Sequence, residues 1–291
     1  MRGDVIIVVL AVFLPTSFVT TYIISTSNGH AEREFPYISD TGTHPPESCI
    51  FGLLLAIYSF ATLITVHSRW EVVRRYHQDN KWNQLVNNAA FLCGIVAAGG
   101  TLIVATFQET NVLSIHLLGA LMAFGVGGVY MWLHTYLSYR LPDIPGWIRS
   151  LCHLRLFMSA LCSCCGCLTA SLGVIAESHR NSSNARTSQP GSGKWHSGME
   201  AYDIHIGSTS FEWATAGLIS LYFLSFVVEF HHIDIGLPVI SVTTQVQPRP
   251  SSSLTSGHCN VGYLEHSDDD GTVFQRPRTV EQNCVENGDT S

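Results

Sequence analysis

Six long apolar segments divide this chain, and they constrain its fold more than any other feature. They cover about residues 5–25, 49–66, 85–107, 112–136, 151–176 and 211–230. Each has a length close to the roughly 17–25 residues that a helix needs to cross a bilayer. Because backbone groups in lipid must be satisfied within the chain, these segments are predicted to be helices. The expected fold is therefore all-α, a polytopic membrane protein with six transmembrane helices.

The composition fits this fold and argues against several functions. Only 13% of the residues are charged, whereas 46% are hydrophobic, and soluble domains carry about 25% charge. No basic patch with interleaved aromatic residues is present, so nucleic-acid binding is not expected. The chain also lacks a phosphate-binding glycine loop, a hydrolase nucleophile motif and a carboxylate paired with a base. We therefore expect no enzyme activity, no catalytic residue and no cofactor.

The first apolar segment could also be a signal peptide. It is longer than the apolar core of a signal peptide, which has about 7–15 residues. Asp4 offsets the charge of Arg2, and no Ala-x-Ala cleavage site follows. We expect the segment to be retained as the first span.

The loops between the spans predict the orientation. The connections after the second and fourth segments carry seven Lys or Arg residues, against four on the opposite side. Basic residues accumulate in cytosolic loops, so both termini should face the cytosol and the first loop should be lumenal. Asn181, in the sequence Asn181-Ser182-Ser183, is an N-glycosylation acceptor in the loop expected over residues 177–210, on the same lumenal side. Residues 1–234 would form the membrane domain, and 235–291, rich in Ser, Pro and Asp, a disordered cytosolic tail.

The first lumenal loop, Phe35–Ser48, is unusually rich in residues that restrict the backbone. Asp40, Thr41 and Gly42 predict a turn in which Gly42 is free to take a positive φ. Pro45-Pro46 suits the first turn of the next helix, and Glu47 adds a negative charge near its N-terminus. An ordered loop is therefore expected.

Ionisable residues in or near the spans are candidates for function because they are costly in lipid. Glu109, His116 and Glu212 are predicted to lie together under the first loop, although such residues are often simply interfacial. Glu229 and His134 are expected at the cytosolic boundary, as interfacial residues.

Four cysteines in the fifth segment, Cys162, Cys164, Cys165 and Cys167, could suggest a metal site. At 100° per residue they spread around the helix and cannot converge on one ion. We interpret them as small residues at helix contacts, and no metal site is predicted. The alternative is palmitoylation of Cys152, near the cytosolic end of that segment.

The first loop resembles that of the DRAM family, the damage-regulated autophagy modulators among the DRAM/TMEM150-type six-span proteins. The signature residues are Pro36, Tyr37, Ile38, Ser39, Asp40 and Thr41, followed by Pro45, Pro46 and Glu47. Weaker matches are Phe107–Thr110 and Glu212-Trp213, and the likeness covers about residues 1–234. The family has no established catalytic residues, so the resemblance implies no active site.

The resemblance implies a multi-pass protein of the lysosomal or endosomal membrane that promotes autophagy and, in some members, apoptosis; use of the Asn181 acceptor would make it a glycoprotein. Its implied partners are the lipid bilayer and membrane or cytosolic autophagy-related proteins. Relatives in the wider superfamily leave open a plasma-membrane adaptor for a phosphoinositide kinase complex. A transporter or channel is a second alternative, but it needs a polar path that the spans barely supply. The tail shows no clear sorting signal, so the lysosomal location rests on the resemblance, and the oligomeric state is open.

Overall fold

The computed structural model describes residues 2–76, 80–142, 144, 146–187, 195, 197–232, 265–267 and 273–275. Residues 1–238 form one compact unit that is helical throughout its regular elements. Its helices are α1 (Gly3–Ser27), α2 (Glu47–Tyr76), α3 (Lys81–Thr106), α4 (Leu113–Ala120), α5 (Gly127–Arg140), α6 (Arg149–Thr187), α7 (Tyr202–Leu224) and α8 (Val227–Phe230). A 3₁₀ turn, η1 (Ser39–Gly42), lies between α1 and α2, and a π-helical turn, η2 (Leu121–Val126), joins α4 to α5.

In the part of the chain that the structure describes, six helical stretches are long and apolar enough to cross a membrane, which confirms the predicted helical fold with six spans. Four of them are α1, α2, α3 and the first part of α6. The other two are composite, since α4, η2 and α5 form one span and α7 with α8 forms another.

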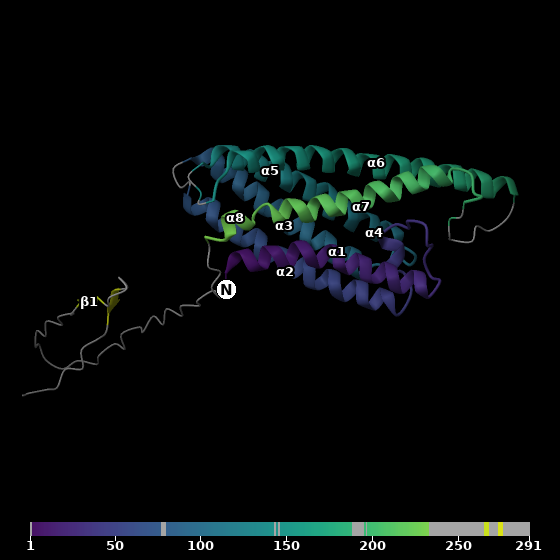
Figure 1. The fold of residues 1–291 in the computed structure, drawn as a ribbon, viewed down its shortest axis with the longest axis horizontal. Coiled ribbons are helices and arrows are strands. Elements are labelled where there is room, and N and C mark those ends of the chain that lie inside the picture. Colours follow the sequence, from purple (N-terminus) through teal and green to yellow (C-terminus); the bar gives the residue numbers. More distant parts are fainter. Residues whose placement is uncertain are drawn as a thin grey trace, which may run out of the picture. The chain divides into compact units, whose positions relative to one another are not determined.

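The spans pack lengthwise into a bundle (Figure 1). α1 packs against α2 and α7, α3 packs against α2 and the fourth span, and α6 packs along α7. The core between them is apolar and includes Leu10, Phe51, Tyr130, Met131 and Phe226. The first loop, α4 and the start of α7 lie at one end, called the loop end here; the N-terminus and α8 lie at the other, the terminal end.

The two ends of the membrane unit meet at the terminal end of the bundle. The Nη2 atom of Arg2 lies 2.9 Å from Nδ1 of His231, and Oδ2 of Asp4 lies 2.9 Å from the same nitrogen. An even number of spans places both ends on the same side of a membrane, and this contact agrees with that.

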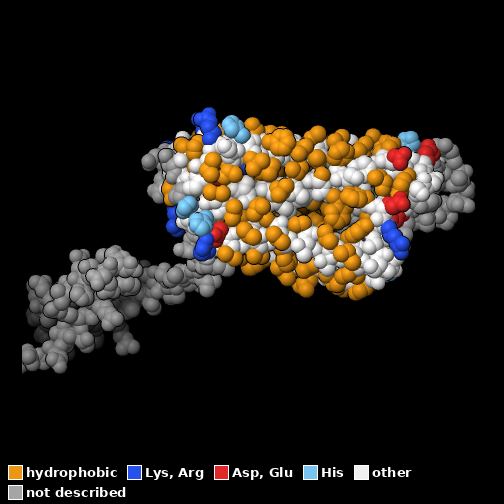
Figure 2. All heavy atoms as spheres, viewed as in Figure 1, with side chains coloured by type: hydrophobic (Ala, Val, Ile, Leu, Met, Phe, Trp, Pro, Cys, Tyr) orange, Lys and Arg blue, Asp and Glu red, His pale blue; other side chains and the backbone are white. Residues whose placement is uncertain are grey.

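The side chains on the surface of the bundle suit a bilayer. Figure 2 shows hydrophobic side chains along the middle of one face, with Lys and Arg mainly near the terminal end and Asp and Glu mainly at the loop end. Leu53, Phe60, Leu92 and Val174 are all more than 60% exposed. Apolar surface of this extent is typical of a membrane-facing protein.

Helices α2 and α6 extend well beyond the apolar segments predicted for them. α2 continues to Tyr76, and its last turns carry ion pairs of 2.9 Å from Glu71 to Arg74 and Arg75. α6 continues to Thr187, with a 3.0 Å pair between Glu177 and Arg180. Pairs spaced three or four residues apart stabilise a helix in water. Hydropathy marks where lipid ends, not where the helix ends.

Residues 239–291 form a second unit. Its described residues are two short strands, β1 (Glu265–Ser267) and β2 (Val273–Gln275), paired antiparallel with His266 opposite Phe274. The rest of the tail lies outside the described residues, so its predicted disorder stays a prediction.

Candidate functional site

The loop between α1 and α2 is fastened to α7 by its signature residues. The indole Nε1 of Trp213 donates to the carbonyl of Pro36 at 3.0 Å, and the hydroxyl of Tyr37 donates to Oγ of Ser208 at 2.8 Å. Ser208 donates in turn to the carbonyl of Thr169 at 2.7 Å, so the chain of hydrogen bonds reaches α6. The bonds made by Pro36 and Tyr37 join positions more than 170 residues apart and fasten the loop to α7.

Glu109 and Glu212, two of the three polar residues predicted under the loop, both bind it. The N–H of Ile38 donates to Oε2 of Glu212 at 2.8 Å, and the hydroxyl of Ser39 donates to Oε2 of Glu109 at 2.5 Å. The third residue, His116, is buried, and its Nδ1 lies 2.7 Å from the carbonyl of the residue that caps α3. The structure thus brings all three to the loop end, the two carboxylates on the loop and the histidine on the helix beside it.

Asp40 places an additional carboxyl group on this loop. Burial is the largest cause that raises its pKa, to about 7, and the negative charges of Glu109 and Glu32 raise it further. A backbone hydrogen bond from Tyr37 and the charge of Arg180 act in the opposite direction. This carboxyl therefore changes its charge between neutral and acidic solution.

Two details of the loop differ from expectation. Gly42 does not take a positive φ; a Cβ there would lie 2.6 Å from Cγ of Phe51, so the close approach of α2 is what requires glycine. Pro45-Pro46 precedes α2 instead of starting it, since the helix begins at Glu47. The carboxylate of Glu47 is fully buried and bonds to His30, which connects the end of α1 to the start of α2.

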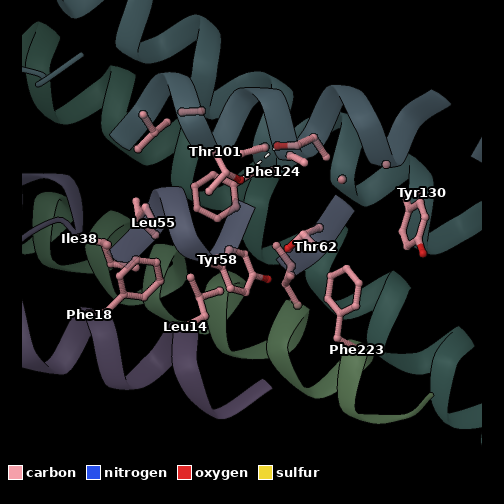
Figure 3. Close-up of a pocket in the computed structure, with 18 of the residues that line it drawn as sticks. Leu14, Phe18, Ile38, Leu55, Tyr58, Thr62, Thr101, Phe124, Tyr130 and Phe223 are labelled. Atoms are coloured by element: carbon pink, nitrogen blue, oxygen red, sulfur yellow. Dashed lines mark hydrogen bonds between the residues drawn. The ribbon is translucent and has the colours of Figure 1, made fainter. Parts of the chain in front are cut away.

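A mostly apolar cavity of about 100 Å³ extends from the loop into the bundle. Figure 3 shows Phe18 and Ile38 at one end of it, Tyr130 and Phe223 at the other, and Thr62 between them. Small residues of α3 and the fourth span leave this space open: Gly94, Ala97, Ala98, Ala120, Ala123 and Gly127. Apolar walls with a few polar groups are typical of small-molecule sites.

Past the inner end of the cavity lies a buried ion cluster, formed by Arg69 of α2, Arg155 of α6 and Glu229 of α8. Arg69 Nη1 is 2.5 Å from Oε2 of Glu229, and Arg155 Nη1 is 2.8 Å from Oε1. Both guanidinium groups lie over the ring of Phe226, at 4.9 and 4.4 Å from its centroid. The cluster is at most 2% exposed.

The prediction that Glu229 and His134 are interfacial residues was wrong. Glu229 pairs with two arginines in the interior, and His134 is 1% exposed beside Tyr130, with 4.4 Å between ring centroids. A signal was available in the sequence, because Arg155 and Glu229 both interrupt apolar segments, where an ionisable residue implies a partner. The spacing of these residues in the sequence does not show which of them pair with each other.

The cysteines divide by position on α6. Cys162 and Cys165 are buried, whereas Cys164 and Cys167 are exposed, so their thiols point to different sides of the helix. The thiol of Cys152 is buried and donates to the carbonyl of Ser138 at 3.3 Å, an environment that does not favour its palmitoylation, which stays a prediction. Among the residues that the structure describes, no group of His, Cys, Asp and Glu could hold a metal ion.

Asn181 lies on α6, whereas the sequence predicts a loop at this position. The reason is that the helix continues past the apolar segment. Its side chain is exposed. Its glycosylation therefore stays a prediction that its exposure permits.

Comparisons with known proteins agree with this architecture. Residues 3–233 match the family model described as Frag1/DRAM/Sfk1/Cwh43P N-terminal domain. The chain is 32% identical over 231 residues to DNA damage-regulated autophagy modulator protein 1 of Xenopus laevis, covering 79% of this chain and 91% of that relative. It is also 32% identical over 231 residues to DNA damage-regulated autophagy modulator protein 2 of Homo sapiens, covering 78% and 83%.

A further relative carries a related name. Modulator of macroautophagy TMEM150B-B of Xenopus laevis is 30% identical over 217 residues, covering 73% of this chain and 79% of its own length. No solved structure matches the chain. The family model spans the whole six-helix unit and includes the loop, the cavity and the ion cluster. The chain therefore belongs to the Frag1/DRAM/Sfk1/Cwh43P family of membrane proteins.

Proposed function

We propose that this protein promotes autophagy by binding partner proteins at the lysosomal or endosomal membrane. The observation that carries the proposal is the match of residues 3–233 to relatives that are named as autophagy modulators. The proposed role is one of recognition, not of reaction, and the partners are membrane or cytosolic proteins of the autophagy machinery. Promotion of apoptosis, as the DRAM likeness implies, belongs to the same proposal.

The fastened loop supports a recognition role. Its hydrogen bonds to α7 and to Glu109 fix its shape before any partner arrives. Phe35, beside the signature, stays 49% exposed and packs edge-on against Trp213 at 6.0 Å between ring centroids. A preorganised loop loses little conformational entropy on binding, which favours affinity.

The proposal includes an orientation. The loop end faces the lumen, with Asn181 glycosylated, and the terminal end faces the cytosol with residues 235–291. Its support is the bias of basic residues toward the connections at the terminal end. A partner of the tail would therefore be cytosolic, and a partner of the loop lumenal.

The test replaces the endogenous protein with a tagged full-length chain and measures localisation and autophagic flux. Deletion should lower the flux, and the wild type should restore it from a lysosomal or endosomal position. The paired variant Tyr37→Phe with Ser39→Ala removes two hydrogen bonds from the loop and should restore less flux at unchanged localisation.

The matched control is Tyr139→Phe. It removes a hydroxyl contact of 2.8 Å with His153, which joins α5 to α6 and involves no residue of the loop. It should behave as the wild type. Residence of the wild type at the plasma membrane together with unchanged flux on deletion would contradict the proposal.

A further inference from the structure

The cavity and the buried ion cluster lie on one continuous internal face. On α2, Thr62 and Val66 line the cavity and Arg69 follows on the same side of the helix, at spacings of four and three residues. On α5, Tyr130 lines the cavity and His134 follows one turn later. The lining of the apolar cavity thus ends about one helical turn before Arg69 and His134, which do not line it themselves.

Several polar groups at this inner end have no hydrogen-bond partner among the described residues. They are the hydroxyl of Tyr130, Nε of Arg69 and Nδ1 of His134. The three residues are between 0% and 2% exposed. Leaving a buried polar atom unpaired costs about 1–3 kcal/mol. So many at one place indicate that a further molecule satisfies them.

The net charge of the cluster also indicates an additional ligand. Two guanidinium groups share one carboxylate, that of Glu229, which leaves one positive charge in excess. No second carboxylate bonds to Arg69 or Arg155 within the described part of the chain. A charge buried without a counter-charge is strongly unfavourable. An anionic group at the inner end of the cavity would supply the missing charge.

The shape of the cavity suggests what carries that anion. Its lining on α2 runs from Phe51 to Val66, which is about 22 Å at 1.5 Å per residue. The walls along that length are mainly apolar, with aromatic and aliphatic side chains facing the small residues of α3. A long, narrow and apolar space fits an extended hydrocarbon chain better than a compact polar solute.

We propose that the cavity and the ion cluster together bind a single aliphatic chain that carries an anionic head group. The chain occupies the cavity between the loop and Tyr130. The head group, a carboxylate or a phosphate monoester, lies at the inner end, where Arg69 supplies charge and the hydroxyl of Tyr130 donates a hydrogen bond. The proposal is independent of any role in autophagy.

The experiment measures binding of radiolabelled palmitate to the purified full-length protein in detergent. Unlabelled palmitate, hexadecyl phosphate, hexadecanol and acetate serve as competitors. Saturable binding is expected, with displacement by palmitate or hexadecyl phosphate; the stronger of the two identifies the head group. Hexadecanol and acetate should compete at least tenfold less well. Equal competition by hexadecanol, or no saturable binding of palmitate and no binding of hexadecyl phosphate, would overturn the proposal.

Variants place the ligand. Tyr130→Phe removes a hydroxyl that has no partner in the described residues, so folding should be preserved while binding weakens about tenfold, as for a hydrogen bond to a charged group. Ala97→Phe fills the cavity and should abolish binding. The control Leu53→Phe changes a side chain that is 63% exposed on the outside of the bundle and should have no effect.

Should Ala97→Phe fail to fold, Tyr130→Phe decides alone, with its thermal unfolding measured beside that of the wild type. Wild-type affinity in a folded Tyr130→Phe variant would contradict the placement of the head group. A folded Ala97→Phe variant that binds palmitate as well as Leu53→Phe does would contradict the placement of the chain.

Discussion

At the residue scale, Glu229 connects three helices at the terminal end of the bundle. It is the one carboxylate that bonds both buried guanidinium groups, and it joins α2, α6 and α8 in the described part of the chain. We predict that Glu229→Gln lowers the free energy of unfolding by about 3–5 kcal/mol, because it leaves two buried positive charges without a counter-charge. Thermal unfolding of the purified protein in detergent measures the change.

A matched control lies on α2. Glu71 also pairs with two arginines, Arg74 and Arg75, but at the exposed end of the helix. Exposed pairs contribute about 0–1 kcal/mol, so Glu71→Gln should leave the unfolding temperature almost unchanged. Equal effects of the two substitutions would show that burial does not govern the cluster.

At the scale of the element, the first loop should respond to pH. The carboxyl of Asp40 has a pKa raised by burial from the ordinary 3.8 to about 7, so between these values the folded loop binds more protons than the unfolded one. Its stability therefore rises as pH falls from about 7 toward 4. Amide hydrogen exchange of residues 35–48, corrected for intrinsic rates, should be slower at pH 5 than at pH 7.5.

Asp40→Asn should flatten this pH dependence, because the amide does not titrate. The groups that face Asp40 are Glu109 and Glu32, which favour protonation, and Arg180, which opposes it. The control Asp203→Asn changes an exposed carboxyl in the first turn of α7, also at the loop end, and should leave the dependence intact. Unaltered pH dependence in Asp40→Asn would exclude Asp40 as its source.

The contact between α3 and η2 is a second element whose geometry can be tested. A Cβ at Gly100 would lie 2.5 Å from Cβ of Met122 and 2.6 Å from the backbone nitrogen of Ala123. Gly100→Ala should therefore destabilise the bundle by about 1–3 kcal/mol through overpacking. At the adjacent Gly99 the nearest atom is 4.0 Å away, so Gly99→Ala should be neutral or stabilising. Unfolding temperatures of the two variants give the comparison.

The sequence predicted these elements unevenly, for physical reasons. Lipid selects apolar runs, so all six spans could be found from hydropathy. The ends of α2 and α6 could not, because ion pairs extend these helices into water. The π turn at η2 leaves the apolar pattern unchanged and was missed. The loop could be predicted as ordered from its prolines, but its anchors, such as Ser208 for Tyr37, lie too far along the chain to be inferred.

For the whole molecule, the arrangement of the ends limits the possible topologies to two. The start of α1 and the residue that follows α8 meet through Asp4 and His231, so these two ends lie on the same side of the membrane. The loop end lies on the other side, with Asn181 exposed on the far part of α6. The remaining choice, which side is lumenal, determines whether the pH response of the loop has a physiological role, since only a lumenal loop would meet an acidic organelle.

Glycosylation resolves this choice. With the loop end in the lumen, treatment of the wild type with a glycosidase should reduce its mass, and Asn181→Gln should abolish that change. In the Asn181→Gln background, Gly262→Thr turns Asn260-Val261-Gly262 into an acceptor within the tail. A cytosolic tail never meets the glycosylation enzymes, so this acceptor should stay unmodified. A glycan on the tail would invert the topology, place the loop in the cytosol and remove the link between Asp40 and lumenal acidity.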